Sequence, residues 1–172
     1  MELRKIPPQI VRSVQQRLSG YHMVVLLPLF QWVRIMTLAD LNPEDRMEMS
    51  CMVLEMLDSW SVSPSQQVFL LGLPDNTKPR AMKKYRETTP LPNTDEVNTR
   101  IDHLLGISDA LFTSYPRNSR MAGFWVNQVQ PRLGGRIPLA MMLEDGLEGL
   151  VAVRAYVDCA WDWHQDSKTS SE

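Results

Sequence analysis

The sequence predicts an all-α fold in which a helix-turn-helix-like bundle is followed by a small helical module. Apolar residues recur every three or four positions between residues 49 and 60 and again between 97 and 105, which is the spacing of half-buried helices. Capping residues followed by Pro or acidic residues precede both stretches, as at helix starts. The 172-residue chain is 44% hydrophobic and 22% charged, a composition typical of a folded protein with an ordinary core.

Residues 1–41 are interpreted as an N-terminal extension. The apolar run Met23–Leu27 is interrupted by Pro28 well before the roughly 20 residues that a membrane span needs, which excludes a transmembrane helix there. No small-residue cleavage pattern follows, so a signal peptide is not expected. The segment is either a specific addition or a translated upstream region, in which case Met23 or Met36 would be the true start.

The first clear helix is predicted from Asn42 to about Trp60. Asn42 is a capping residue, Pro43 suits the first turn, and the acidic residues that follow favour the positive end of the helix dipole. Its apolar face comprises Met49, Met52, Val53, Met56, Leu57 and Trp60. A second, short helix is predicted after the cap and capping-box sequence Ser63–Gln66, and it ends at Gly72.

A basic helix is predicted next, and Met82 and Tyr85 would anchor it to the preceding helices. A helix, a turn with Gly and a basic helix are the order of a helix-turn-helix, whose second helix enters the major groove of DNA. The apolar anchors lie about four residues further from Gly72 than a tight turn predicts. The candidate DNA-binding residues are Lys78, Arg80, Lys83, Lys84 and Arg86.

DNA contact would have to come from this local patch, because the formal net charge of -2 argues against binding through bulk positive charge. A solvated helix face without DNA is the alternative interpretation. The helix-turn-helix region is assigned to residues 42–90, and Thr88–Pro92 is interpreted as a linker.

A further helix is predicted from Thr94, whose hydroxyl precedes two acidic residues. Its buried stripe comprises Val97, Ile101, Leu104 and Leu105. Another helix is expected to carry Ile107, Leu111 and Phe112 and to end near Tyr115-Pro116.

The segment 117–163 contains the most distinctive turn of the chain, Gly134-Gly135-Arg136. Two consecutive glycines allow backbone angles that a side chain disfavours, so they mark a tight corner. Pro138 suits the start of a short helix, and Asp145 is expected to cap the helix after it. The buried stripe of that last helix is predicted to comprise Leu147, Leu150, Val151, Val157 and Trp161.

Motifs for catalysis were not found. The chain has no Gly-rich phosphate loop, HExxH pair, nucleophile elbow or paired Cys-His spacing, so no catalytic residue, metal or cofactor is expected. Cys159 and His164 do not share a helix face well enough to form a thiol–imidazole pair. Cys51 and Cys159 lack a CxxC spacing and are expected to be buried thiols in a reducing cytoplasm.

The C-terminal region also resembles a known family. Trp125, the run Pro131–Leu139 with its Gly-Gly-Arg-x-Pro, and the segment Leu143–Leu150 with its Asp-Gly-x-x-Gly occur in the order and spacing of the toxin-binding domain of the Xre/MbcA/ParS antitoxins. Val129-Gln130 stands where that family often has Pro-Asn. The resemblance assigns residues 91–163 to a toxin-binding module and leaves 164–172 as a polar tail.

This resemblance implies a non-enzymatic antitoxin of a type II toxin–antitoxin system. Such an antitoxin would neutralise a RES-domain toxin, which consumes NAD, by covering its active-site cleft, and would repress its own operator as a homodimer. The candidate toxin-binding residues are Arg136, Arg154, Trp163 and His164. Arg136 could instead serve the Gly-Gly corner, and Arg154 could pair with Glu148 or Asp158. The alternative functions are an orphan transcription regulator and a protein-interaction adaptor without a toxin.

Overall fold

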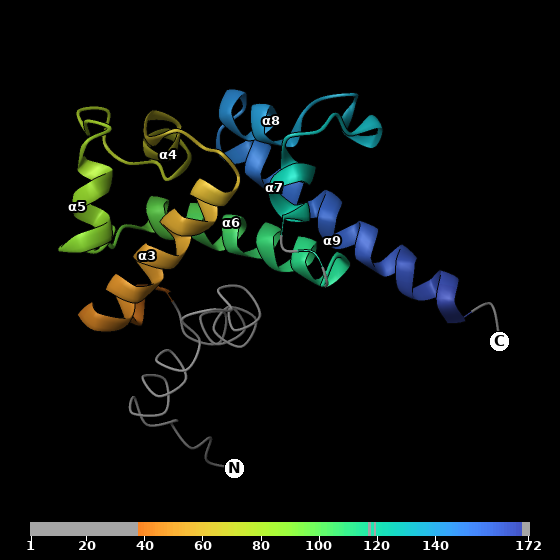
Figure 1. Cartoon of the computed structure of the whole chain (residues 1–172), viewed down its shortest axis with the longest axis horizontal. Helices are drawn as coiled ribbons and strands as arrows, with labels where there is room; N and C mark the ends of the chain where they lie inside the picture. The colour runs from red at the N-terminus through yellow and green to blue at the C-terminus, as the bar shows by residue number, and fades with distance from the viewer. Residues whose placement is uncertain (1–37, 117, 119, 170–172) are drawn as a thin grey trace, which may run out of the picture.

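The computed structural model describes residues 38–116, 118 and 120–169, with side chains as far as Cys159. The N-terminal extension, apart from residues 38–41, lies outside this part of the chain. Helices dominate the described residues, and the one β-type pairing found among them is an isolated bridge between Gln130 and Arg136. The predicted all-α class is therefore confirmed. Figure 1 shows the elements, which are η1 Leu38–Asp40, α3 Pro43–Ser59, α4 Pro64–Leu70, α5 Ala81–Glu87, α6 Asp95–Ser114, α7 Met121–Val126, η2 Pro131–Leu133, α8 Pro138–Glu144 and α9 Leu147–Thr169.

The predicted starts of α3 and α4 are confirmed by local hydrogen bonds. Asn42 Oδ1 accepts from the backbone N–H of Asp45 at 2.9 Å, at the start of α3. Before α4, Gln66 Oε1 accepts from the backbone N–H of Ser63 at 2.9 Å, as in a capping box. Gly72 follows α4 with a φ of +62°, a conformation that favours glycine at a helix end. Local sequence signals therefore placed the first two helices.

One hydrophobic core extends across the boundary between the two predicted regions. α6 contacts both α3 and the helices α7 and α9, and α4 contacts α8 (Figure 1). Trp60 is buried at the end of α3, where its carbonyl accepts from Asn127 Nδ2 at 2.9 Å. Leu91, in the segment interpreted as a linker, is 1% exposed, and its N–H donates to Ser50 Oγ at 2.8 Å. The described helices therefore pack as one body.

The structure corrects the prediction for residues 94–116. The second helix expected around Ile107 to Phe112 is not separate, because α6 runs continuously from Asp95 to Ser114. The predicted buried stripe on this helix is confirmed, and it continues without a break into Ile107 and Leu111. No glycine with positive φ or proline interrupts the helix, so nothing in its backbone requires a turn.

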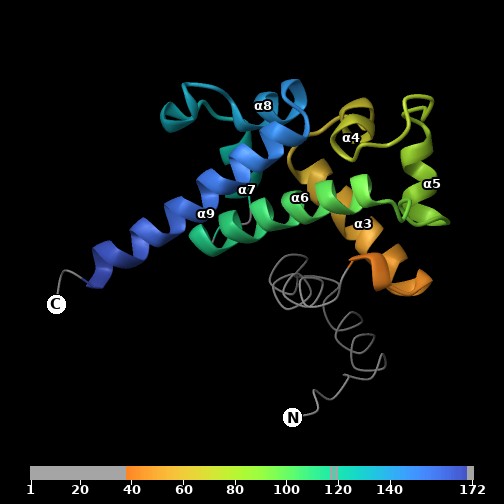
Figure 2. The same cartoon turned by 180° about the vertical axis from the view of Figure 1, so that it is seen from behind.

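The last helix also differs from the prediction. α9 packs against α6 and α8 through Leu150, Val153 and Val157, whereas Leu147 and Val151, which were predicted to be buried, are exposed. Cys159 is exposed too, and the prediction that it is buried was wrong. The backbone of α9 continues to Thr169, into the expected polar tail, and both views show it running on past α6 (Figures 1 and 2). No described helix is long and apolar enough to cross a membrane.

Candidate functional site

The basic helix α5 forms at the place predicted, and its inner face is anchored to the core. Met82 is buried, and Tyr85 packs partly buried against the core. Four residues of the predicted DNA-binding patch are exposed on the outer side, namely Lys78, Arg80, Lys83 and Lys84. Lys83 and Glu87 form an exposed ion pair at 3.8 Å, one turn apart. This face therefore presents positive charge to solvent.

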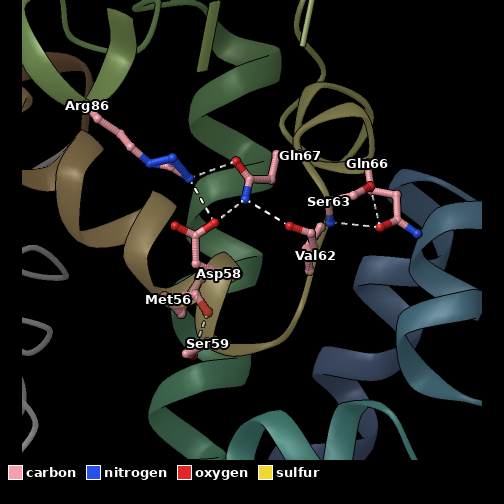
Figure 3. Close-up of polar contacts among 8 residues, drawn as sticks. All are labelled: Met56, Asp58, Ser59, Val62, Ser63, Gln66, Gln67 and Arg86. Carbon is pink, nitrogen blue, oxygen red and sulfur yellow. Dashed lines mark hydrogen bonds and ion pairs between the residues drawn. The ribbon is translucent and has the colours of Figure 1, made fainter. Parts of the chain in front are cut away.

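Arg86, the fifth residue of that predicted patch, points into the protein instead. Its Nη2 lies 2.8 Å from Asp58 Oδ1 on α3 and donates to Gln67 Oε1 on α4 at 3.2 Å (Figure 3). Gln67 Nε2 donates in turn to the same Asp58 oxygen at 2.7 Å and to the carbonyl of Val62 at 3.0 Å. We call Asp58, Gln67 and Arg86 the α5 clamp, since they join α3, α4 and α5.

The connection before α5 is longer than in a tight helix-turn-helix. α4 ends at Leu70 and α5 begins at Ala81. Short turns fill this connection, with the N–H of Thr77 bonded to the carbonyl of Pro74 and that of Ala81 bonded to the carbonyl of Lys78. α5 also makes contacts with both α3 and α4. The order of the elements agrees with the prediction, and the connection keeps the extra length that the sequence indicated.

The Gly-Gly-Arg corner is a closed loop between α7 and α8. The N–H of Gln130 donates to the carbonyl of Arg136 at 3.0 Å, and the N–H of Gly135 donates back to the carbonyl of Gln130 at 3.1 Å. Gly134 and Gly135 have φ values of +67° and +74°, so both need the left-handed region that glycine adopts without strain. The predicted role of the two glycines is confirmed.

Arg136 is held by two carboxylates at the end of α8. Its guanidinium pairs with Glu144 Oε2 at 2.7 Å and with the carboxylate of Asp145. The hydrogen bonds that Arg136 donates lower the pKa of Asp145. Because Asp145 and Glu144 accept these bonds, they raise the pKa of Arg136. Asp145 was predicted to cap the next helix, but its described side-chain hydrogen bonds all come from Arg136. The loop is thus fastened to α8 by Arg136.

Arg154 lies in the contact between α9 and α6. Its Nε donates to Asp158 Oδ2 at 2.7 Å, the pairing considered as its alternative role, and its Nη1 donates to the carbonyl of Asp102 at 3.3 Å. A Cβ atom on Gly106 would fall 1.1 Å from Arg154 Nη1, so the guanidinium occupies the space that this glycine leaves open. The side chain is 14% exposed. Arg154, a predicted toxin-binding residue, therefore joins α9 to α6.

Sequence reasoning missed the exposed apolar side chains of the C-terminal region. Leu147 and Val151 lie one turn apart on α9, and Ala155 and Cys159 continue the same exposed stripe at intervals of four. Val129 and Ile137 are exposed on either side of the Gln130–Arg136 bridge. We call Leu147, Val151, Ala155 and Cys159 the α9 stripe. A signal existed, because the apolar residues of α9 are too many for one helix face to bury.

Two predicted toxin-binding residues, Trp163 and His164, lie outside the residues whose side chains are described. Their backbone belongs to α9. Further back along this helix, the ring of Tyr156 stacks on that of Trp125 from α7, with centroids 5.9 Å apart. Trp125, part of the sequence signature, therefore helps to hold α9 in place.

Comparison with known proteins identifies this region. Residues 109–159 match the model of the antitoxin Xre/MbcA/ParS C-terminal toxin-binding domain. The match begins within α6 and includes α7, the Gly-Gly-Arg loop, α8 and the first half of α9. No curated protein matches the chain. The resemblance inferred from the sequence is thereby confirmed over these residues.

Proposed function

Because residues 109–159 carry an Xre/MbcA/ParS-type toxin-binding domain, we propose that the chain is the antitoxin of a type II toxin–antitoxin system. Its partner is a RES-domain, NAD-consuming toxin, whose active-site cleft the antitoxin covers. The chain acts in the cytoplasm by binding and carries out no reaction of its own.

The distribution of exposed apolar side chains supports this proposal. Seven large hydrophobic residues are exposed in the described part of the chain, and six of them lie within residues 109–159. Single exposed apolar residues are ordinary on soluble proteins, but exposed apolar residues that lie together mark a protein–protein interface. They are Tyr115, Phe124, Val129, Ile137, Leu147 and Val151. A protein partner is therefore expected at this region rather than at α3, α4 or α5.

We assign the α9 stripe to the toxin contact, with Val129 and Ile137 as a second apolar contact. Trp163 and His164 extend the contact toward the end of α9. Arg136 is 37% exposed while holding the loop to α8, so it both positions this contact and reaches its edge. Arg154 supports the contact through the α6–α9 packing.

A double variant of the α9 stripe tests this assignment. Leu147→Lys combined with Val151→Lys is expected to weaken binding of the co-encoded RES toxin by about tenfold or more, since burying one aliphatic side chain contributes about 1.5 kcal/mol. Isothermal titration of the purified antitoxin against a catalytically inactive toxin measures the affinity. Growth of cells that co-express the active toxin gives the functional readout.

Phe69→Lys is the matched control for this experiment. Phe69 is an exposed hydrophobic residue of α4 outside residues 109–159, so its replacement should leave toxin affinity unchanged. Equal affinities for the double variant, the control and the wild-type chain would refute the assignment to the α9 stripe. Failure of the wild-type chain to bind or neutralise any co-encoded toxin would instead favour the orphan regulator or the adaptor.

We propose further that α5 contacts operator DNA, which lets the chain repress its own transcription. The exposure of Lys78, Arg80, Lys83 and Lys84 supports phosphate contacts from these four residues. The chain would bind as a homodimer, because paired recognition helices read half-sites about 34 Å apart. An affinity that falls steeply with salt would support this proposal, whereas an adaptor would show no such binding.

A further inference from the structure

We infer that Asp58 and Gln67 are positioning residues for DNA binding, because they hold Arg86 and thereby fix the direction in which α5 presents Lys83 and Lys84. This inference rests on the proposed DNA contact of α5. It changes the role of Arg86, which the sequence alone placed among the residues that touch DNA. By this inference Asp58 increases the affinity for DNA, although both the residue and the DNA are negatively charged.

The geometry of the α5 clamp is that of a closed network (Figure 3). One oxygen of Asp58 receives hydrogen bonds from both Arg86 and Gln67, at 2.8 and 2.7 Å. Gln67 is 0% exposed, and its amide bridges the two charged groups while also donating to the backbone of Val62. A fully buried amide with both its ends engaged sets the positions of its partners closely.

α5 depends on such outside contacts because it is short. It spans Ala81–Glu87, and its N-cap residue Arg80 makes no side-chain capping bond. Helices of this length are not stable by themselves in water, so tertiary contacts must supply both its stability and its orientation. Met82 and Arg86, four residues apart, lie on the inner face and provide two of these contacts. Cys51 Sγ adds a third by donating to the carbonyl of Arg86 at 3.1 Å.

The exposed fractions of the basic side chains distinguish Arg86, which is bonded to the protein, from the residues that face solvent. The Arg86 side chain is 28% exposed and bonded to two partners, whereas that of Lys83 is 79% exposed. Arg80, Lys83 and Lys84 lie at intervals of three and four, which places them together on the outer face. If the clamp opens, α5 can rotate or fray, and these cations no longer meet the phosphates together.

The direction in which DNA affinity changes when the negative charge of Asp58 is removed tests this inference. Removing an acidic residue from a DNA-binding protein by itself strengthens DNA binding, because a repulsion from the phosphates is lost. For Asp58→Asn the clamp predicts the opposite, namely an affinity about five- to tenfold weaker, because Arg86 loses its charged partner. The ligand is the DNA duplex directly upstream of the chain's own coding sequence, measured by fluorescence anisotropy with the full-length protein.

Glu55→Gln is the matched control, since Glu55 is exposed on the same helix, one turn before Asp58, and lies outside the clamp. It should leave the affinity unchanged or slightly raise it. Asp58→Glu keeps the carboxylate and should recover most of the affinity. Hydrogen exchange at the amides of Thr88 and Thr89, which close the end of α5 on the carbonyl of Lys84, should accelerate in Asp58→Asn but not in Glu55→Gln.

Each outcome has a distinct meaning. If Asp58→Asn binds DNA as tightly as Glu55→Gln does, the positioning role is overturned while DNA binding by α5 stands. If its exchange accelerates across the whole chain, Asp58 stabilises the fold in general, and a specific role in positioning α5 is likewise overturned. If the wild-type chain does not bind the duplex, the proposed DNA contact and this inference both fall, and the toxin assignment is unaffected.

Discussion

Replacement of Arg46 by Met is expected to lower the free energy of unfolding by roughly 3 to 5 kcal/mol. Arg46 is a 4% exposed residue of α3, and its guanidinium bonds to Leu38, before the predicted helix-turn-helix region, and to three residues after that region. Its Nε donates to the carbonyl of Leu91 at 2.8 Å and its Nη1 to the carbonyl of Leu38 at 2.9 Å. Its Nη2 donates to Asn98 Oδ1 on α6 at 2.8 Å and to the carbonyl of Pro92.

The expected loss comes from the acceptors that remain. Met can fill the space of the aliphatic part of the Arg46 side chain, but it offers no hydrogen to the three backbone carbonyls that Arg46 now satisfies. Each buried acceptor without a donor costs about 1 to 3 kcal/mol. One effect opposes this loss, because burial lowers the pKa of Arg46 and Met avoids the cost of placing a cation there. Because three carbonyls lose their donor and only one cation is removed from a buried site, we expect the unsatisfied acceptors to determine the change in the free energy of unfolding.

Urea denaturation followed by circular dichroism measures the change, with Arg80→Met as the control. Arg80 is exposed, so the same substitution there should change the stability by less than about 0.5 kcal/mol. An Arg46→Met variant as stable as the control would mean that water replaces the guanidinium at these carbonyls.

Features determined by neighbouring residues were predictable from the sequence. The starts of α3, α4 and α6 were placed correctly because Asn42, Ser63 and Thr94 bond to groups only three residues away. The corner at Gly134-Gly135 was found for the same reason, since its requirement for positive φ is a property of the residues themselves.

Features that depend on distant partners could not be derived in the same way. An amphipathic pattern shows that a helix has an apolar side, but the position of α6 and α8 decides that Val153 is buried and Val151 exposed on α9. The sequence likewise offered Arg86 as a free cation, because Asp58 and Gln67 lie 28 and 19 residues away along the chain. Most of the fold was therefore predictable, whereas the roles of the charged residues required the tertiary contacts.

Gly149→Ala is the second substitution expected to have a large effect, with a loss of roughly 2 to 4 kcal/mol in stability. A Cβ atom at this position of α9 would lie 2.3 Å from the carbonyl oxygen of Met141 and 3.0 Å from the Cα atom of Met142, both on α8. Because these are backbone atoms, a change of rotamer cannot relieve the overlap, and α8 and α9 must move apart. The higher helix propensity of Ala, worth about 1 kcal/mol, offsets only part of this cost.

Gly146→Asn provides the comparison three residues earlier, in the turn between the same two helices. Gly146 has a φ of +61°, and a Cβ atom added there would meet no other atom within 4 Å. Asn tolerates this backbone conformation, so the substitution should cost no more than about 1 kcal/mol.

Thermal unfolding together with toxin titration separates two explanations for Gly149. If the Gly149→Ala variant loses both stability and toxin affinity, the close packing of α8 on α9 shapes the binding domain. Unchanged affinity in a destabilised variant would mean that the toxin contacts α9 without depending on α8, and the contact would then be confined to the α9 stripe.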